Sequence, residues 1–189
     1  DFCLSRGLGD VYKRQGALST TFLIRAAGYT ASEVGTVNKL LGLAATIVGV
    51  LAGGALMARL GLYRSLMLFG LLQAVSNLGF WVISVSPHNV WIMAAGVGIE
   101  NLCGGMGTAA FVALLMGLCN QQFSATQFAL LSALTAVGRT YLAGPLTPQL
   151  VQYAGWPTFF LLTVLIALPG LWLLHWRRRD IDRIDAKGL

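Results

Sequence analysis

Three ionisable side chains lie inside long apolar stretches of the 189-residue sequence and are its main candidates for chemistry: Glu100, Arg139 and Lys39. An ionisable group deep in an apolar segment is costly, which makes it a candidate for function. The carboxyl of Glu100 could take up and release a proton, and the cations of Arg139 and Lys39 could bind an anionic group. A purely structural role is also open, in which Glu100 and Arg139 form an internal ion pair.

Small or hydroxylated residues lie at helical spacing from each of these charges. They are Gly96, Gly104, Gly107 and Thr108 for Glu100; Ser132, Thr135, Ala136 and Ala143 for Arg139; and Gly35, Thr36, Gly42 and Thr46 for Lys39. Small residues mark the helix surface that packs on other helices or lines a cavity. We therefore expect all three charges to face the interior.

Amide side chains near the charges are weaker candidates. Asn38, Asn101 and Gln127 could hydrogen-bond sugar hydroxyls, whereas the i, i+4 pair Gln73 and Asn77 is better explained by helix–helix hydrogen bonds. The sequence contains no metal-ligand cluster, catalytic triad or phosphate loop, so we expect no metal and no cofactor. An intramembrane enzyme would need a second catalytic group, and none is apparent, so we expect no enzyme.

The composition places these residues in a membrane protein. Hydrophobic residues make up 56% of the sequence and charged residues 11%, against about 25% charged in a typical soluble domain. The net charge of +6 is concentrated in a short loop and in the C-terminal tail, which is typical of cytoplasmic loops and argues against nucleic-acid binding. The lipid bilayer is thus the expected surrounding.

Apolar runs predict an all-α bundle of five full transmembrane helices and one truncated helix. The full spans are expected at Glu33–Ala58, Ser65–Val85, Val90–Leu118, Ala125–Val151 and Trp156–Trp176, and the truncated one at Gly16–Ala27. Gly144, Pro145 and Pro148 should interrupt the fourth full span. The bundle thus occupies residues 16–176, followed by a basic tail at 177–189.

Basic residues also predict the orientation. Arg59 and Arg64 share one short loop, and four spans, an even number, separate it from the arginine-rich tail. Both are therefore expected on the cytoplasmic side, which places the C-terminus inside and the Ser86–Asn89 turn outside.

Residues 1–15 differ from the rest because they are polar and lack periodicity. Asp10–Gln15 matches the translation of a common transposon-end sequencing adapter, so we interpret residues 1–15 as an artefact that shortens the first helix. The alternative is a genuine amphipathic segment.

Two capping boxes open equivalent apolar helices. Thr30–Glu33 and Ser124–Gln127 both read S/T-x-x-E/Q, a pattern in which two side chains satisfy backbone N–H groups reciprocally. They begin the second and fifth of six helices, as an inverted repeat would. For Glu33 a capping role is favoured over a transport role.

The loop after the first full span resembles the basic loop signature of the major facilitator superfamily, in its C-terminal half. The matching positions are Gly54, Arg59, Gly61 and Arg64, whereas Ala58 replaces an acidic residue that is often found there. The usual charge relay at that loop is thus in doubt.

A more specific resemblance, to the AmpG-type muropeptide permeases, covers the chain from Gly16 to about Trp176. It rests on the segments Thr21–Arg25, Glu33–Gly35, Val37–Lys39, Leu43–Val48, Glu100–Thr108, Phe111–Met116, Phe123–Leu134 and Ala136–Arg139.

This resemblance implies proton-coupled import of anhydro-muropeptides, which are peptidoglycan fragments, through the inner membrane of Gram-negative bacteria. It also implies a link to β-lactamase induction and a missing N-terminal half, without which this chain should not transport. The alternatives are a facilitator for another anion such as an acyl-coenzyme A, or a scaffold or receptor that does not transport.

Overall fold

The computed structural model of the chain describes residues 19–25, 27–119, 124–138, 144–178 and 181. Within these ranges all regular secondary structure is helical, which confirms the all-α class. A helix satisfies every interior backbone N–H and C=O within its own segment, as an apolar bilayer requires.

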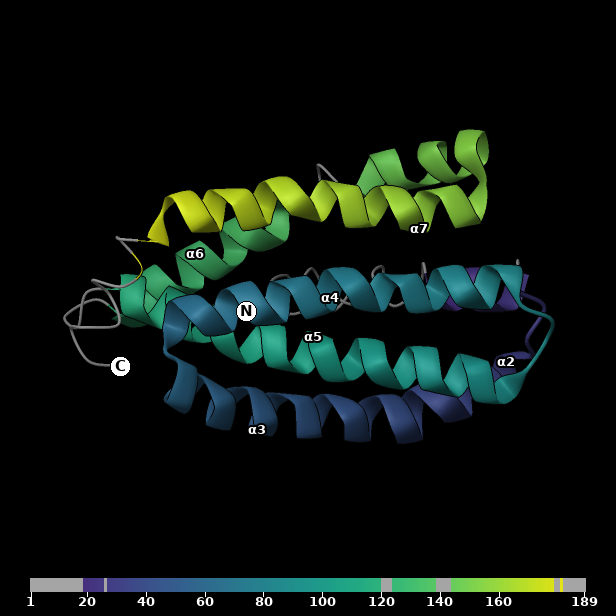
Figure 1. The fold of residues 1–189 in the computed structure, drawn as a ribbon, viewed down its shortest axis with the longest axis horizontal. Helices are drawn as coiled ribbons and strands as arrows, with labels where there is room; N and C mark the ends of the chain where they lie inside the picture. Colours follow the sequence, from purple (N-terminus) through teal and green to yellow (C-terminus); the bar gives the residue numbers. More distant parts are fainter. Residues whose placement is uncertain (1–18, 26, 120–123, 139–143, 179–180, 182–189) are drawn as a thin grey trace.

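The helices follow one another with short connections (Figure 1). After a short helix at 19–25, the elements are α2 (Ala31–Thr36), the π-helix η1 (Val37–Gly42), α3 (Leu43–Leu60), α4 (Leu62–Val85), α5 (Val90–Leu118), α6 (Ser124–Gly138) and α7 (Gly144–Trp176). α2, η1 and α3 form one continuous helical rod. α7 bends at Gly155, where φ is +76°, at the turn expected between the last two spans.

Four helical segments are long and apolar enough to cross a bilayer: Ala31–Leu60, Leu62–Val85, Val90–Leu118 and Gly155–Trp176. They match four of the five predicted full spans. The other prediction, Ala125–Val151, falls on α6 and the first part of α7, and its apolar helix Ala125–Thr135 is shorter. Residues 139–143 lie outside the described part of the chain, so the count of five full spans is not confirmed.

α5 lies between α3 and α4, and α7 packs on the far side of α4 (Figure 1). Glycines bring α3 and α5 into backbone contact. A Cβ at Gly49 would overlap a backbone carbonyl of α5, and a Cβ at Gly53 would lie 2.7 Å from the Cα of Met106. A Cβ at Gly105 would lie 2.5 Å from the carbonyl oxygen of Thr46. The sequence motif Gly49-x-x-x-Gly53 is thus a helix-packing motif, as predicted.

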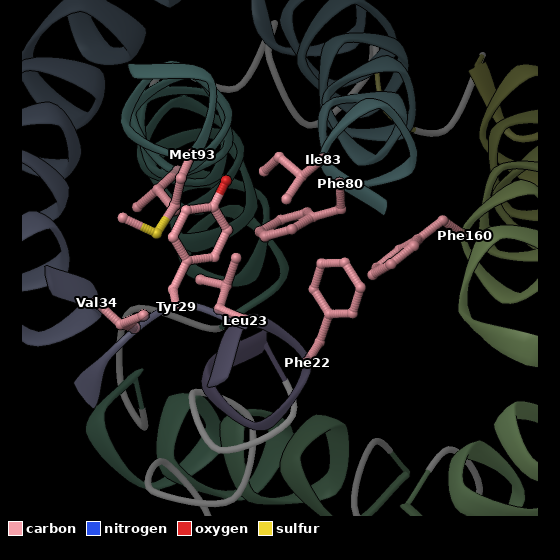
Figure 2. Close-up of a cluster of buried hydrophobic side chains, with 9 residues drawn as sticks. Phe22, Leu23, Tyr29, Val34, Phe80, Ile83, Met93 and Phe160 are labelled. Carbon is pink, nitrogen blue, oxygen red and sulfur yellow. The ribbon is translucent and has the colours of Figure 1, made fainter. Parts of the chain in front are cut away.

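Two clusters of buried apolar side chains hold α4 and α5 together near their opposite ends. Figure 2 shows the first, in which the ring of Phe22 meets that of Phe160 at a centroid distance of 4.9 Å. Its buried members are Phe22, Leu23, Tyr29, Val34, Phe80, Ile83, Met93, Val97 and Phe160. The second consists of Leu62, Leu66, Phe69, Ala110, Ala113 and Ile181. The predicted tail therefore contacts the bundle through Ile181.

The turns before α2 and α5 are tied together. The backbone N–H of Glu33 donates to the hydroxyl of Thr30 (3.3 Å), and Glu33 accepts from the N–H of Thr30 (2.9 Å). This confirms the capping box and the structural role of Glu33. The hydroxyl of Tyr29 donates to the carbonyl of Asn89 (3.0 Å), and His88 Nε2 lies 4.0 Å from Glu33 Oε2.

The close contact between α3 and α5 leads to a prediction about the stability of the protein. Gly105→Ala should lower stability by about 1–3 kcal/mol, because the added methyl meets backbone atoms of α3 that cannot move without separating the helices. Thermal unfolding of the purified protein in detergent measures the effect. Gly107→Ala is the matched control, since its Cβ would meet nothing within 4 Å. Equal melting temperatures for the two variants would contradict this packing.

Candidate functional site

Glu100 lies on the face of α5 that contacts α4. Gly96 and Gly104 lie one turn away in each direction and share its face, because an α-helix has 3.6 residues per turn. A Cβ at Gly96 would lie 2.7 Å from Ile83 Cδ1, and a Cβ at Gly104 would lie 3.5 Å from Gln73 Oε1. Both partners belong to α4, so the half-buried Glu100 faces α4 between these two points.

Two polar side chains of α4 lie on the other side of this contact. The two glycines beside Glu100 contact Gly79 and Gln73, respectively. Ser76 lies midway between Gln73 and Gly79 along α4. Because α4 and α5 are antiparallel, Ser76 lies at the same height as Glu100, which is midway between the two glycines of α5. Ser76 is only 4% exposed, and its hydroxyl donates to the carbonyl of Gln73 (2.8 Å). We call Glu100, Gln73 and Ser76 the α4–α5 polar seam.

The polar seam contains incompletely paired groups. Gln73 Oε1 is buried and accepts no hydrogen bond from any described residue. Glu100 likewise forms no hydrogen bond or ion pair within the described part of the chain. It lies close enough to Cys103, one turn further along α5, for the carboxylate and the thiol to interact electrostatically.

Arg139 follows α6 directly and lies outside the described residues. The proposed ion pair between Glu100 and Arg139 therefore stays a prediction, as does the binding role of Arg139.

Lys39 and Asn38 lie in η1. Because η1 is a π-helix, their side chains point in other directions around the helix axis than α-helical spacing predicts. Lys39 is exposed and Asn38 half-buried, whereas Gly42 is buried and packs against the amide of Asn101. A π-helix has a wider turn than an α-helix, because its hydrogen bonds span five residues. The α-helical spacing that grouped Lys39 with Gly42 and Thr46 therefore does not hold within η1. Lys39 is exposed in this chain, and its expected direction toward the interior of the complete transporter stays a prediction.

Asn101 faces α3, on the other side of α5 from the polar seam. Its Nδ2 donates to the carbonyl of Val97 (2.8 Å), and its Oδ1 lies 3.2 Å from the hydroxyl of Thr46. That hydroxyl also lies 2.9 Å from the carbonyl oxygen of Gly42, so its single proton is shared between two acceptors. The amide predicted to bind substrate thus also joins α5 to the η1–α3 junction.

The remaining candidates lie elsewhere. Gln127 is half-buried in the first turn of α6. In the basic loop, Arg59 and Arg64 are exposed and flank Gly61, whose φ of +79° is readily adopted by glycine. Gly54 is in α3, where a Cβ would meet nothing within 4 Å.

The predicted residues thus fall into two separate places rather than one. Glu100 belongs to the polar seam, whereas Lys39 and Asn38 lie on the η1 side of α5.

Sequence reasoning missed Ser76 and interpreted Gln73 only as a packing residue. The available signal was their spacing of about one turn within an apolar helix. Among the described residues no three potential metal ligands lie together.

Comparison with known proteins places this bundle in a family. Residues 15–187 match the profile of the Major Facilitator Superfamily. The chain is 59% identical over 175 residues to the anhydromuropeptide permease of Escherichia coli (strain K12), which covers 93% of this chain and 35% of that protein. It is 35% identical over 170 residues to the AmpG 4 protein of Rickettsia felis, covering 88% of this chain and 40% of that protein.

A third relative, the AmpG 1 protein of Rickettsia prowazekii, is 34% identical over 147 residues, covering 78% of this chain and 33% of that protein. The chain therefore spans well under half the length of each of these curated relatives. The profile match extends over nearly all of the described helices. Together with the bundle of long apolar helices, it shows that the chain belongs to the Major Facilitator Superfamily.

Proposed function

We propose that this chain is part of an inner-membrane transporter that imports anhydro-muropeptides into the cytoplasm together with protons. The observation that carries the proposal is the 59% identity over 175 residues to the E. coli protein named anhydromuropeptide permease. The match covers 93% of the chain, so the likeness extends through the whole bundle rather than through one motif. The name of the E. coli relative describes a permease, which favours transport over catalysis.

The separation of the polar seam from the η1 residues Lys39 and Asn38 suggests that the two groups have different roles. Glu100, in the interface of α4 and α5, would carry the coupling proton. Lys39 and Asn38, on the η1 side, would bind the substrate, with the cation on a peptide carboxylate and the amide on a sugar hydroxyl. Arg139, Asn101 and Gln127 remain further candidates for substrate contact.

The exposed position of Lys39 fits a site that a second part of the transporter completes. Substrate sites in this superfamily lie between two halves of the molecule, and this chain corresponds to 35% of the E. coli relative. We propose that an N-terminal half covers the Lys39 face and that the C-terminus is cytoplasmic, because the basic loop and the arginines after α7 share one side.

Uptake into membrane vesicles tests the function. The chain, substituted for the segment that it matches in the E. coli permease, should support accumulation of labelled anhydro-muropeptide driven by a proton gradient. The chain alone should show none, because half of the substrate site is missing. Robust uptake by the chain alone, or none by a correctly inserted chimera, would contradict the proposal.

Glu100→Gln in the chimera should abolish gradient-driven accumulation but leave exchange of internal for external substrate intact, since the amide cannot release a proton. Accumulation and exchange are measured in the same vesicles. Glu33→Gln is the matched control, because a glutamine can still serve in the capping box, and it should accumulate normally. Normal accumulation by the Glu100→Gln chimera would remove the proton role.

Lys39→Ala should raise the KM for uptake about tenfold, because a charge-assisted hydrogen bond to a substrate carboxylate is lost. The maximal rate should change little. Lys39→Arg keeps the charge and should retain most of the affinity. A KM unchanged by Lys39→Ala would show that the substrate does not contact this side chain.

A further inference from the structure

The polar seam occupies the stretch of the α4–α5 interface that neither apolar cluster covers. On α4, the first cluster contributes Phe80 and Ile83, and the second ends at Phe69. On α5, the first cluster extends to Val97 and the second begins at Ala110. Glu100, Gln73 and Ser76 lie between these limits, so buried apolar side chains flank the seam in both directions along the helices.

Glycines make room for the side chains of the seam. A Cβ at Gly79 would lie 3.5 Å from the Cα of Gly96, so the two backbones run close together one turn from Glu100. On the other side of Glu100, the amide of Gln73 packs beside Gly104, with Oε1 at 3.5 Å from the position that a Cβ would take.

Within the seam, the unpaired oxygen of Gln73 can be satisfied only by the protonated form of Glu100, whereas the Nε2 of Gln73 could donate to either form. The hydroxyl of Ser76 already donates its single proton to the carbonyl of Gln73, so its oxygen can only accept further bonds. Gln73 Oε1 is also an acceptor, and it is buried without a partner among the described residues. A carboxylate offers acceptors alone, whereas a protonated carboxyl offers one O–H donor.

We propose that Gln73 is a positioning residue that accepts a hydrogen bond from the protonated carboxyl of Glu100, and that Ser76 borders the same intramembrane proton-binding site. The inference rests on the proposed proton role of Glu100 and assigns the group that holds the proton in place. A buried acceptor without a donor costs about 1–3 kcal/mol, and protonation of Glu100 removes that cost. The site lies about 100° around α5 from the Asn101 amide and apart from the exposed side of η1 on which Lys39 lies.

Few other ionisable groups face Glu100 from the surrounding helices. On α5 itself Cys103 is the neighbour. The described residues of α6 carry no ionisable side chain, and those of α4 are Tyr63 and Arg64, near its first turn and far from the seam. Lys39 and Arg59 belong to η1 and α3, which pack on the other side of α5. Arg139 lies outside the described residues.

Infrared difference spectroscopy of the purified chimera, recorded between acidic and alkaline pH, tests this hydrogen bond without requiring transport. The C=O stretch of protonated Glu100 is the band that disappears in Glu100→Gln. In Gln73→Leu this band should move to higher frequency, because the O–H loses its acceptor. The proton affinity read from the band should fall about fivefold, as expected for a net hydrogen bond of about 1 kcal/mol.

Further variants guard against a folding effect. Gln73→Met has a similar shape without the amide and should behave as Gln73→Leu. Gln152→Leu replaces an exposed glutamine of α7 and should leave the band and its pH dependence unchanged. In uptake, Gln73→Leu should shift the pH profile to lower pH and leave the KM at saturating proton concentration unaltered.

Two results would overturn the inference. One is a Glu100 band that is unchanged by both Gln73 variants. The other is a higher proton affinity in these variants, which would mean that the amide donates to the carboxylate instead. The proton role fails separately, if Glu100→Gln still accumulates substrate while the band responds to Gln73 as expected.

Discussion

The close backbone contact between α3 and α5 is the constraint on which the rest of the bundle depends. At Gly49 and Gly105 the two helices approach so closely that no side chain fits between them. In a bilayer, apolar side chains gain little by leaving lipid for protein, so packing and interhelical hydrogen bonds decide which helices associate. The contact holds one side of α5 against α3 and leaves the opposite side for α4.

This two-sided packing of α5 decides where the polar groups lie. Glu100 and Asn101 are neighbours in sequence but differ by about 100° around the helix. One therefore meets α4 at the polar seam and the other meets the η1–α3 junction, where it pairs with Thr46. A shift of α5 against either neighbour would alter both environments together, which would provide a physical link between a proton on one side and a substrate on the other.

The π-helix is the second feature on which the arrangement of the candidate site depends. It lies directly before the tightest part of the α3–α5 contact, where the hydroxyl of Thr46 bonds the carbonyl of Gly42 and the amide of Asn101. Its wider turn places Gly42 against α5 and Lys39 on the exposed side. Single-turn π-helices occur often at functional sites, in agreement with the role proposed for Lys39.

Sequence alone determined the helical class, four of the spans, the Thr30–Glu33 cap and the packing role of Gly49 and Gly53, because each depends on a single segment and its solvent. Span length and apolar content are local properties, and so is a capping box. Only the tertiary structure showed that Glu100 faces α4, that Gln73 and Ser76 oppose it, and that Lys39 is exposed. These facts depend on which helices meet and in what register, and a local π-turn alters the periodicity from which a sequence predicts faces.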